Sequence, residues 1–207
     1  MARQQLLPPS ASSLSASMRD LGYSLEAAVA DLVDNSISAH ATRVAIVCDL
    51  ASEHPSLSIL DNGDGMTADE LILAMRHGAA HPDRPRRADD LGRFGLGLKT
   101  ASFSQCRRMT VVARKAGVLS GAEWNLDLID QKDDWVLLVL NDDEAADQPG
   151  VSGLGSKGTV VVWRLLDRLF EDERGDRRDE IVNEKLGMLD RHLALVFHRF
   201  LSGEVKG

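Results

Sequence analysis

The chain has 207 residues, of which 43% are hydrophobic, and this is enough to form one domain with a buried core. Lysine and arginine number 24 against 32 aspartates and glutamates, so the net charge of −8 argues against a protein that binds nucleic acid over its whole surface. The N-terminus lacks the apolar core of a signal peptide and no apolar run approaches the ~18 residues that cross a bilayer, which favours a cytoplasmic protein.

The first half of the chain predicts two helices, a pair of strands and a third helix. The second helix begins after Ser24 and carries a stripe of apolar residues at helical spacing. Thr67 and Glu70 form a capping box, which starts the third helix. The predicted helices cover 10–21, 24–41 and 67–77, and the predicted strands cover 43–50 and 56–60.

The second half begins with residues 78–92, which lack periodicity and are rich in Pro, Arg, Asp and Ala, as in a long functional loop. Beyond it we expect helices over 97–105 and 183–202, and strands over 108–114, 122–128, 135–140 and 159–165. This order predicts an α+β fold, a two-layer sandwich with a mixed sheet and helices on one face. We expect a single domain over 1–207, with its core over about 14–165.

Asp31 and Asn35 lie four residues apart on the second predicted helix, so their side chains project from the same side. An exposed polar face would explain this spacing equally well. Alternatively, the Asn35 oxygen can ligate Mg²⁺ and the Asp31 carboxylate can orient a water molecule toward a phosphate. The two cysteines, Cys48 and Cys106, form no CxxC pair, and no Cys–His cluster has metal-ligand spacing.

The segment LSILDNGDGM, residues 57–66, is a strand that runs directly into a glycine turn at Asp61. The glycines permit positive φ angles and the close approach of a flat ligand. A carboxylate at Asp61 can accept a hydrogen bond from the amino group of adenine, whereas guanine would place a second acceptor there. A plain Asp-Gly turn is the simpler alternative.

The segment LGRFGLGLKTAS, residues 91–102, places three glycines just before a predicted helix, where backbone N–H groups favour phosphate. It is not a P-loop, because Leu98 stands where the lysine should follow and no strand precedes it. The later segment 150–157 fails the same test, and no strand–helix–strand unit supports a dinucleotide site. Downstream, Thr159 opens a strongly β segment after Gly158.

Taken in order, ADLVDNS, DNGDGM, GRFGLGLKTAS and KGT resemble the four motifs of the superfamily of gyrase B, ninety-kilodalton heat-shock chaperones, histidine kinases and MutL (GHKL). The resemblance covers roughly residues 14–165, and the third motif is most similar to MORC-type and related bacterial ATPases. It implies the Bergerat ATP-binding fold, with ATP and Mg²⁺ as ligands.

By this resemblance, Asn35 coordinates Mg²⁺, Asp61 holds adenine with support from Thr159, and Gly65 and Met66 line the base. Asp31 stands at the position of the hydrolytic base. An ATP lid is implied from about His77 to Arg93. The implied phosphate loop consists of Gly92, Arg93, Phe94, Gly95, Leu96, Gly97, Leu98 and Lys99.

The sequence departs from the family pattern at two positions: the base is usually Glu where this chain has Asp31, and Ser38 replaces a frequent Asp. Hydrolysing members also use a lysine from a following transducer domain, which a longer chain or a partner would have to supply. We therefore expect weak hydrolysis and a nucleotide-driven conformational switch that promotes homodimers. The alternatives are a non-hydrolysing ATP sensor and a histidine-kinase-type phosphotransferase, with His40 and His77 expected to be ordinary surface or capping residues.

Overall fold

The computed structural model describes residue 5 and residues 8–21, 23–50, 52–77, 97–170 and 176–203. Its centre is a six-stranded sheet in the order β1-β2-β6-β3-β4-β5. The strands are β1 (Val44–Asp49), β2 (Ser56–Asp61), β3 (Arg108–Lys115), β4 (Val118–Asn125), β5 (Leu138–Leu140) and β6 (Gly158–Arg164).

All the pairings between the described strands are antiparallel, so the expectation of a mixed sheet is corrected. β2 and β3 do run in the same direction, with helices between them in the chain. They are not neighbours, however, because β6 lies between them and is antiparallel to both. The sheet would be mixed if β2 and β3 were neighbours, but β6, which comes last in the chain among the described strands, pairs with both and makes every pairing antiparallel.

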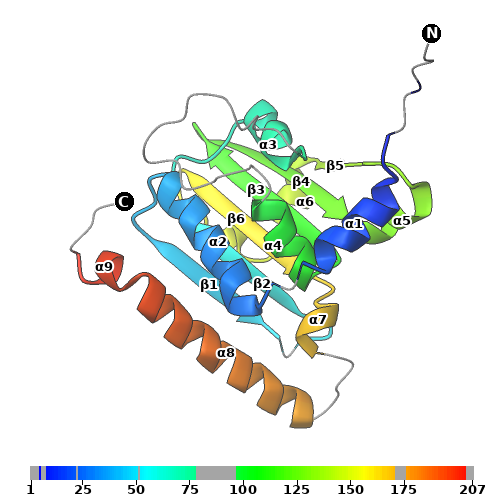
Figure 1. The fold of residues 1–207 in the computed structure, drawn as a ribbon. Coiled ribbons are helices and arrows are strands. Elements are labelled where there is room, and N and C mark those ends of the chain that lie inside the picture. The colour runs from blue at the N-terminus through cyan, green and yellow to red at the C-terminus, as the bar shows by residue number, and fades with distance from the viewer. Residues whose placement is uncertain are drawn as a thin grey trace.

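Helices cover mainly one face of this sheet, as Figure 1 shows. α1 (Ala11–Arg19), α2 (Leu25–Ser38) and α4 (Gly97–Gln105) lie on that face, and α8 (Asp176–Val196) packs outside α2. The short helix α6 (Asp142–Ala146) and the 3₁₀ turn at Val151–Gly153 cover part of the opposite face, where they form a second small cluster with β3 and β6. The remaining helices are α3 (Ala68–Met75), α5 (Leu126–Lys132), α7 (Asp167–Phe170) and α9 (His198–Leu201).

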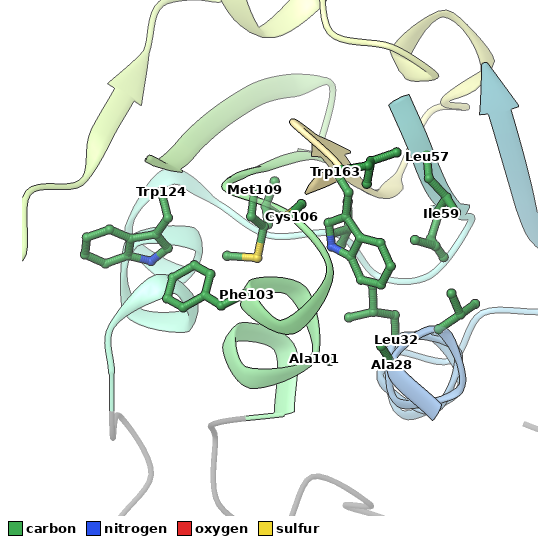
Figure 2. Packing of buried hydrophobic residues seen from close by; sticks show 14 of the residues in the cluster. Ala28, Leu32, Leu57, Ile59, Ala101, Phe103, Cys106, Met109, Trp124 and Trp163 are labelled. Carbon is green, nitrogen blue, oxygen red and sulfur yellow. The ribbon is translucent and has the colours of Figure 1, made fainter. Parts of the chain in front are cut away.

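The main core lies between the sheet and these helices, and aromatic rings are at its centre although the chain has few of them. In Figure 2, Trp163 projects from β6 toward Leu32 of α2, and Phe103 of α4 points toward Trp124 of β4. The Trp163 indole N–H donates to the Ser102 hydroxyl at 2.8 Å, so a fully buried ring still has its polar group satisfied. This contact fixes α4 against the sheet.

The sequence-based elements differ from the structure mainly after residue 115. The predicted strand over 122–128 ends at Asn125, because the Asn125 side chain accepts a hydrogen bond from the backbone of Asp127 and starts α5 there. The short helices α6 and α7 were not predicted. The last long helix begins at Asp176, seven residues before the predicted start at 183, and stops at Val196. Within the described ranges, no helix combines the length and the apolar character needed to cross a membrane.

His77 was expected to be an ordinary surface or capping residue, but its ring lies against the core. The ring centroid is 4.1 Å from that of Trp135, 5.3 Å from Trp124 and 5.8 Å from Phe103. Both ring nitrogens are buried without a hydrogen-bond partner among the described residues. Burial, with a smaller effect from the nearby Lys99 charge, lowers the pKa of His77 to about 4. His40 is exposed as expected and pairs with Asp64 at 2.7 Å.

We predict that His77 makes the fold sensitive to mild acid. An unfolded histidine has a pKa of about 6.5, so between this value and about 4 the unfolded chain binds more protons than the folded one. The free energy of unfolding should therefore fall as the pH is lowered through this window. Urea unfolding of the wild type and of His77→Phe at pH 7 and pH 5 tests this. The wild type should lose more stability than the variant, and equal losses would contradict the assignment.

Candidate nucleotide-binding site

Asp61 is the buried acidic residue at the end of β2, with only 7% of its surface exposed. One carboxylate oxygen accepts hydrogen bonds from the backbone N–H of Gly63 at 2.8 Å and of Thr159 at 3.2 Å. The other oxygen accepts from the Ser36 hydroxyl at 3.2 Å. Burial raises the pKa of Asp61, and the three hydrogen bonds oppose this shift. A carboxylate has about four acceptor positions, so capacity for one more donor remains.

The turn after Asp61 is tied to the connection between α2 and β1. The Asn62 side chain accepts from the backbone N–H groups of Thr42 and Arg43, both at 2.9 Å, and the Asp64 N–H donates to the Ala39 carbonyl at 2.9 Å. A side chain at Gly63 would lie 2.6 Å from that same carbonyl. The tight turn therefore brings the ends of α2 and β2 together.

Two glycines with positive φ complete the surroundings of Asp61. Gly65 has a φ of 65°, and a Cβ there would lie 2.0 Å from the Arg114 carbonyl oxygen. Gly158 has a φ of 130°, and its Cβ would lie 2.1 Å from the Asp61 carbonyl oxygen. Because β6 approaches β2 so closely at Gly158, the Thr159 N–H reaches the Asp61 carboxylate. Met66, which follows Gly65, is partly buried against the main core.

Asp31 and Asn35 lie on α2, as the motif predicted, and both are beyond the buried stripe of that helix. The Asn35 side chain is exposed. Asp31 is half-buried. Burial raises the pKa of Asp31, and the neighbouring Tyr23 hydroxyl opposes this shift. At Ser38, where the family often has Asp, the hydroxyl is buried without a partner among the described residues.

The start of α4 lies beside Asp31. A Cβ added to Gly97, the first residue of α4, would be 3.9 Å from an Asp31 carboxylate oxygen. The first N–H groups of any helix lack partners within the helix and favour an anion. The Asp31 carboxylate on α2 therefore lies close to the first N–H groups of α4, those of Gly97 and Leu98.

The Lys99 side chain points away from the start of α4 and toward the end of α3. It is almost fully buried, and its ammonium donates to the carbonyl oxygens of Ala74 at 2.7 Å and Arg76 at 2.9 Å, at the end of α3. Burial lowers the pKa of Lys99 to about 8. In this structure, only its backbone N–H is placed to face a phosphate at the start of α4. The predicted loop residues Gly92, Arg93, Phe94, Gly95 and Leu96 lie outside the described residues, as does the predicted lid from His77 to Arg93 except for His77 itself.

No group of three or more His, Cys, Asp or Glu side chains in the described part of the chain forms a metal cluster. Mg²⁺ is commonly bound through one or two protein oxygens together with substrate phosphates and water. An exposed carboxamide at Asn35, one helical turn from Asp31, fits that kind of site. The described cysteines, Cys48 and Cys106, are both free, as expected.

Comparison with known proteins identifies the family of the chain. The model of the family "Histidine kinase-, DNA gyrase B-, and HSP90-like ATPase" matches residues 23–153, more than half of the chain. The chain belongs to this family. The match includes α2, β2 and α4, and membership supports ATP binding by the chain.

Similar proteins come from several branches of the family. The chain is 32% identical over 146 residues to the DNA mismatch repair protein MutL of Sphingopyxis alaskensis, which covers 69% of the chain and 21% of the relative. It is 30% identical over 96 residues to the ATPase MORC2B of Mus musculus, covering 45% and 9%. It is 34% identical over 82 residues to the chaperone protein HtpG of Paramagnetospirillum magneticum, covering 35% and 13%. The chain thus spans at most about a fifth of the length of these relatives.

Three residues around the site were not selected from the sequence. Ser36 lies directly after Asn35 and binds Asp61, so its place in the motif was the available signal. Gly158 belongs to the KGT motif but was assigned no role, although its close approach to β2 requires glycine. Tyr23 lies outside all four motifs, and only the folded chain brings it to Asp31.

We predict that Gly65 tolerates no side chain. Gly117 is the matched control, because it also has a positive φ, of 81°, but nothing lies within 4 Å of an added Cβ. Gly117→Ala should lower the free energy of unfolding by about 1–2 kcal/mol, the cost of the left-handed conformation. Gly65→Ala should cost about 1–3 kcal/mol more, because the Cβ must displace the Arg114 backbone. Urea unfolding measures both, and equal losses would show that the turn can move away.

Proposed function

We propose that the chain binds ATP with Mg²⁺ at this site and hydrolyses ATP slowly. The observation that carries the proposal is the buried Asp61 carboxylate, which is held by three donors and retains acceptor capacity at the end of β2. A ligand that fills this capacity must present a hydrogen-bond donor. The adenine amino group is such a donor, while the corresponding position of guanine is an acceptor.

The base lies along the glycine turn in this proposal, with Gly65 and Met66 against it and Thr159 supporting Asp61. Gly65 keeps the turn tight against the Arg114 backbone, and Met66 beside it is partly buried against the main core. The resemblance places both residues against the base. A site of this kind can discriminate ~10⁴-fold against a base that presents a mismatched polar group. Preference for ATP over GTP follows from this arrangement.

The phosphates extend toward the start of α4 in this proposal, where the N–H groups of Gly97, Leu98 and Lys99 point outward along the helix axis. The sequence motif adds Gly92 to Leu96 as further phosphate ligands. The Asn35 oxygen would hold Mg²⁺ together with phosphate oxygens. When bound, the ion neutralises charge on the phosphates and helps to position them.

Asp31 is the proposed base for hydrolysis. Its carboxylate accepts a proton from water as the water oxygen forms a bond to the γ-phosphorus. The bond from the γ-phosphorus to the bridging oxygen breaks, and its electron pair leaves with ADP. Burial, which raises the pKa of Asp31, suits a proton acceptor.

The rate should be low because Asp31 replaces the longer Glu. One methylene fewer places the carboxylate ~1.5 Å further from the water, and a misplacement of ~1 Å can cost ~10²-fold. We therefore infer turnover below the usual enzyme range of about 1–10³ s⁻¹. A non-hydrolysing ATP sensor is the second candidate, favoured by the same short side chain.

Phosphotransfer from histidine has less support. His40 is paired with Asp64, and His77 is packed among aromatic rings. A nucleotide-dependent homodimer and a further transducer segment or partner remain part of the proposal by resemblance alone. The similar proteins carry names for different roles, and this chain spans a small part of each, so the proposal concerns only the nucleotide site.

We predict that Asp61→Asn weakens ATP binding by ~30-fold or more, because a lost charged acceptor and an unpaired polar group cost ~2–4 kcal/mol. Asp64→Asn is the matched control. It lies in the same turn but is exposed, and it pairs with His40 and Lys157 instead of facing the site. Calorimetric titration with ATP should give near wild-type affinity for the control. Unchanged ATP affinity in Asp61→Asn would contradict the assignment of Asp61 to adenine.

A further inference from the structure

We propose that Arg108 and Arg164 form an oxyanion-binding site on the face of the sheet opposite to α1, α2 and α4. Arg108 begins β3 and Arg164 ends β6, and the two residues lie directly opposite each other in the antiparallel pairing of these strands. The ligand is a carboxylate or a phosphate group, because both present two or more oxygen atoms to the fork of N–H groups on a guanidinium. The site is separate from the proposed nucleotide site.

The side chains of both arginines lie on the sheet face that carries the smaller hydrophobic cluster. Successive residues of a strand point to opposite faces. Met109 and Trp163, their neighbours in the chain, belong to the main core beneath the large helices, so Arg108 and Arg164 point the other way. α6 and the turn at Val151–Gly153 cover only part of this face. The arginine side chains remain 37% and 25% exposed, so a ligand can reach them.

Two arginines share a single carboxylate at this place. Glu123 on β4 is buried, and one of its oxygens accepts from Arg164 at 2.6 Å and from the Thr110 hydroxyl at 2.8 Å. Its other oxygen lies 3.3 Å from the Arg108 Nε. Like charges directly opposite each other on a sheet are destabilising. One carboxylate neutralises only one of the two arginines, so positive charge remains here on a chain with a net charge of −8.

The two guanidinium groups have more donors than the described residues use. Each guanidinium carries five N–H groups. The hydrogen bonds of Arg164 to Glu123 and Thr110 both come from Nη2. Arg108 forms no hydrogen bond to a described residue, and the Nε atoms of both arginines are buried without such a partner. Several N–H groups of the pair are therefore available to a ligand.

The contacts around Glu123 also hold the pair in a fixed arrangement. Thr110 is fully buried between the strands, and its hydroxyl contacts both Glu123 and Arg164. A binding group whose side chains are already ordered loses less entropy when its ligand arrives. Arg164 is thus prepositioned by the sheet, and Arg108 beside it has the freedom to close on an anion.

One acid lies in the same row of the sheet, but it does not supply the missing negative charge. Asp49 on β1 is opposite Ser56, and Ser56 on β2 is opposite Arg164. Asp49 is therefore two strands from Arg164, about 10 Å away at the backbone. It is exposed, and no ion pair joins it to either arginine. The Ser56 side chain places a hydroxyl donor beside the pair instead.

The arginine pair is remote from the proposed nucleotide site. The Thr159 N–H binds Asp61 at the start of β6, and Arg164 is five residues further along that strand. Five residues of extended strand span about 16 Å. The Asp61 side chain also points to the helical face, as do Leu57 and Ile59 of the same strand. A ligand at the arginine pair therefore does not compete with ATP.

The test is a titration of the ¹⁵N-labelled chain with inorganic phosphate and, separately, with succinate, at constant ionic strength. The side-chain Nε–Hε NMR signals of Arg108 and Arg164 report on the site directly. We expect saturable shifts of both signals, with a Kd of ~1 mM, as a few charge-assisted contacts provide. Tighter binding of phosphate would identify a phosphate ligand, and tighter binding of succinate a carboxylate. Absence of saturable shifts with both anions would overturn the inference.

Arg108→Gln is the first variant, because Glu123 keeps its hydrogen bonds from Arg164 and Thr110 in its absence. The affinity for the tighter anion, read from the Arg164 signal, should fall ~10-fold. Arg43→Gln is the matched control. It removes the same charge from an exposed position at the start of β1, and it should change the Kd less than twofold. Equal losses in the two variants would mean that only net charge matters, which would overturn the inference.

Arg108→Lys separates the fork of N–H groups from the charge that carries it. A lysine keeps the positive charge but cannot donate two parallel hydrogen bonds. We expect its affinity for the anion to fall at least ~3-fold below that of the wild type. Wild-type affinity in Arg108→Lys would show that a point charge is sufficient, and would overturn the assignment of the site to a pair of guanidinium groups.

Discussion

The Asp61 carboxylate is buried at the end of β2, and a buried charge is stable only when it is hydrogen-bonded. Its donors come from three different parts of the chain: Ser36 on α2, Gly63 in the following turn and Thr159 at the start of β6. To satisfy this one group, α2, the end of β2 and the start of β6 must therefore meet at the same end of the strands. Gly65 and Gly158 allow these elements to come together, because a side chain at either position would collide with backbone atoms.

A second set of contacts fixes the position of α4 relative to the sheet. The carbonyl groups at the end of α3 have no partners within their helix. Those of Ala74 and Arg76 accept from Lys99, and that of Met75 accepts from the Trp124 indole at 3.0 Å. Because Lys99 belongs to α4, the end of α3 and the start of α4 are held together on the helical side of the sheet. The proposed phosphate end of the site thus depends on a buried lysine that the phosphates need not touch.

The local motifs predicted where these residues lie in the fold: Asp31 and Asn35 four residues apart on α2, and Asp61, Gly65 and Thr159 where a strand ends or begins. Their roles in ligand binding stay predictions. The long-range contacts were not predictable from one sequence. Lys99 was expected at the phosphates because it ends a glycine motif, yet its side chain is directed by α3, which precedes it by more than 20 residues. Ser36 acts through a tertiary contact with Asp61 that leaves no periodic signal. Likewise, the antiparallel sheet depends on where β6 inserts, and pairing partners are set by packing across the whole sheet.

The central claim is that Asp61 selects the ligand by accepting a hydrogen bond from the adenine amino group. Calorimetric titration of the wild-type chain with ATP and with inosine triphosphate, both with Mg²⁺, tests it most directly. The two nucleotides share their ribose and phosphates and differ at the position where adenine has its amino group and hypoxanthine a carbonyl oxygen. The account predicts that ATP binds at least ~100-fold more tightly, because inosine would leave two acceptors facing each other. Equal affinity for the two nucleotides would contradict it.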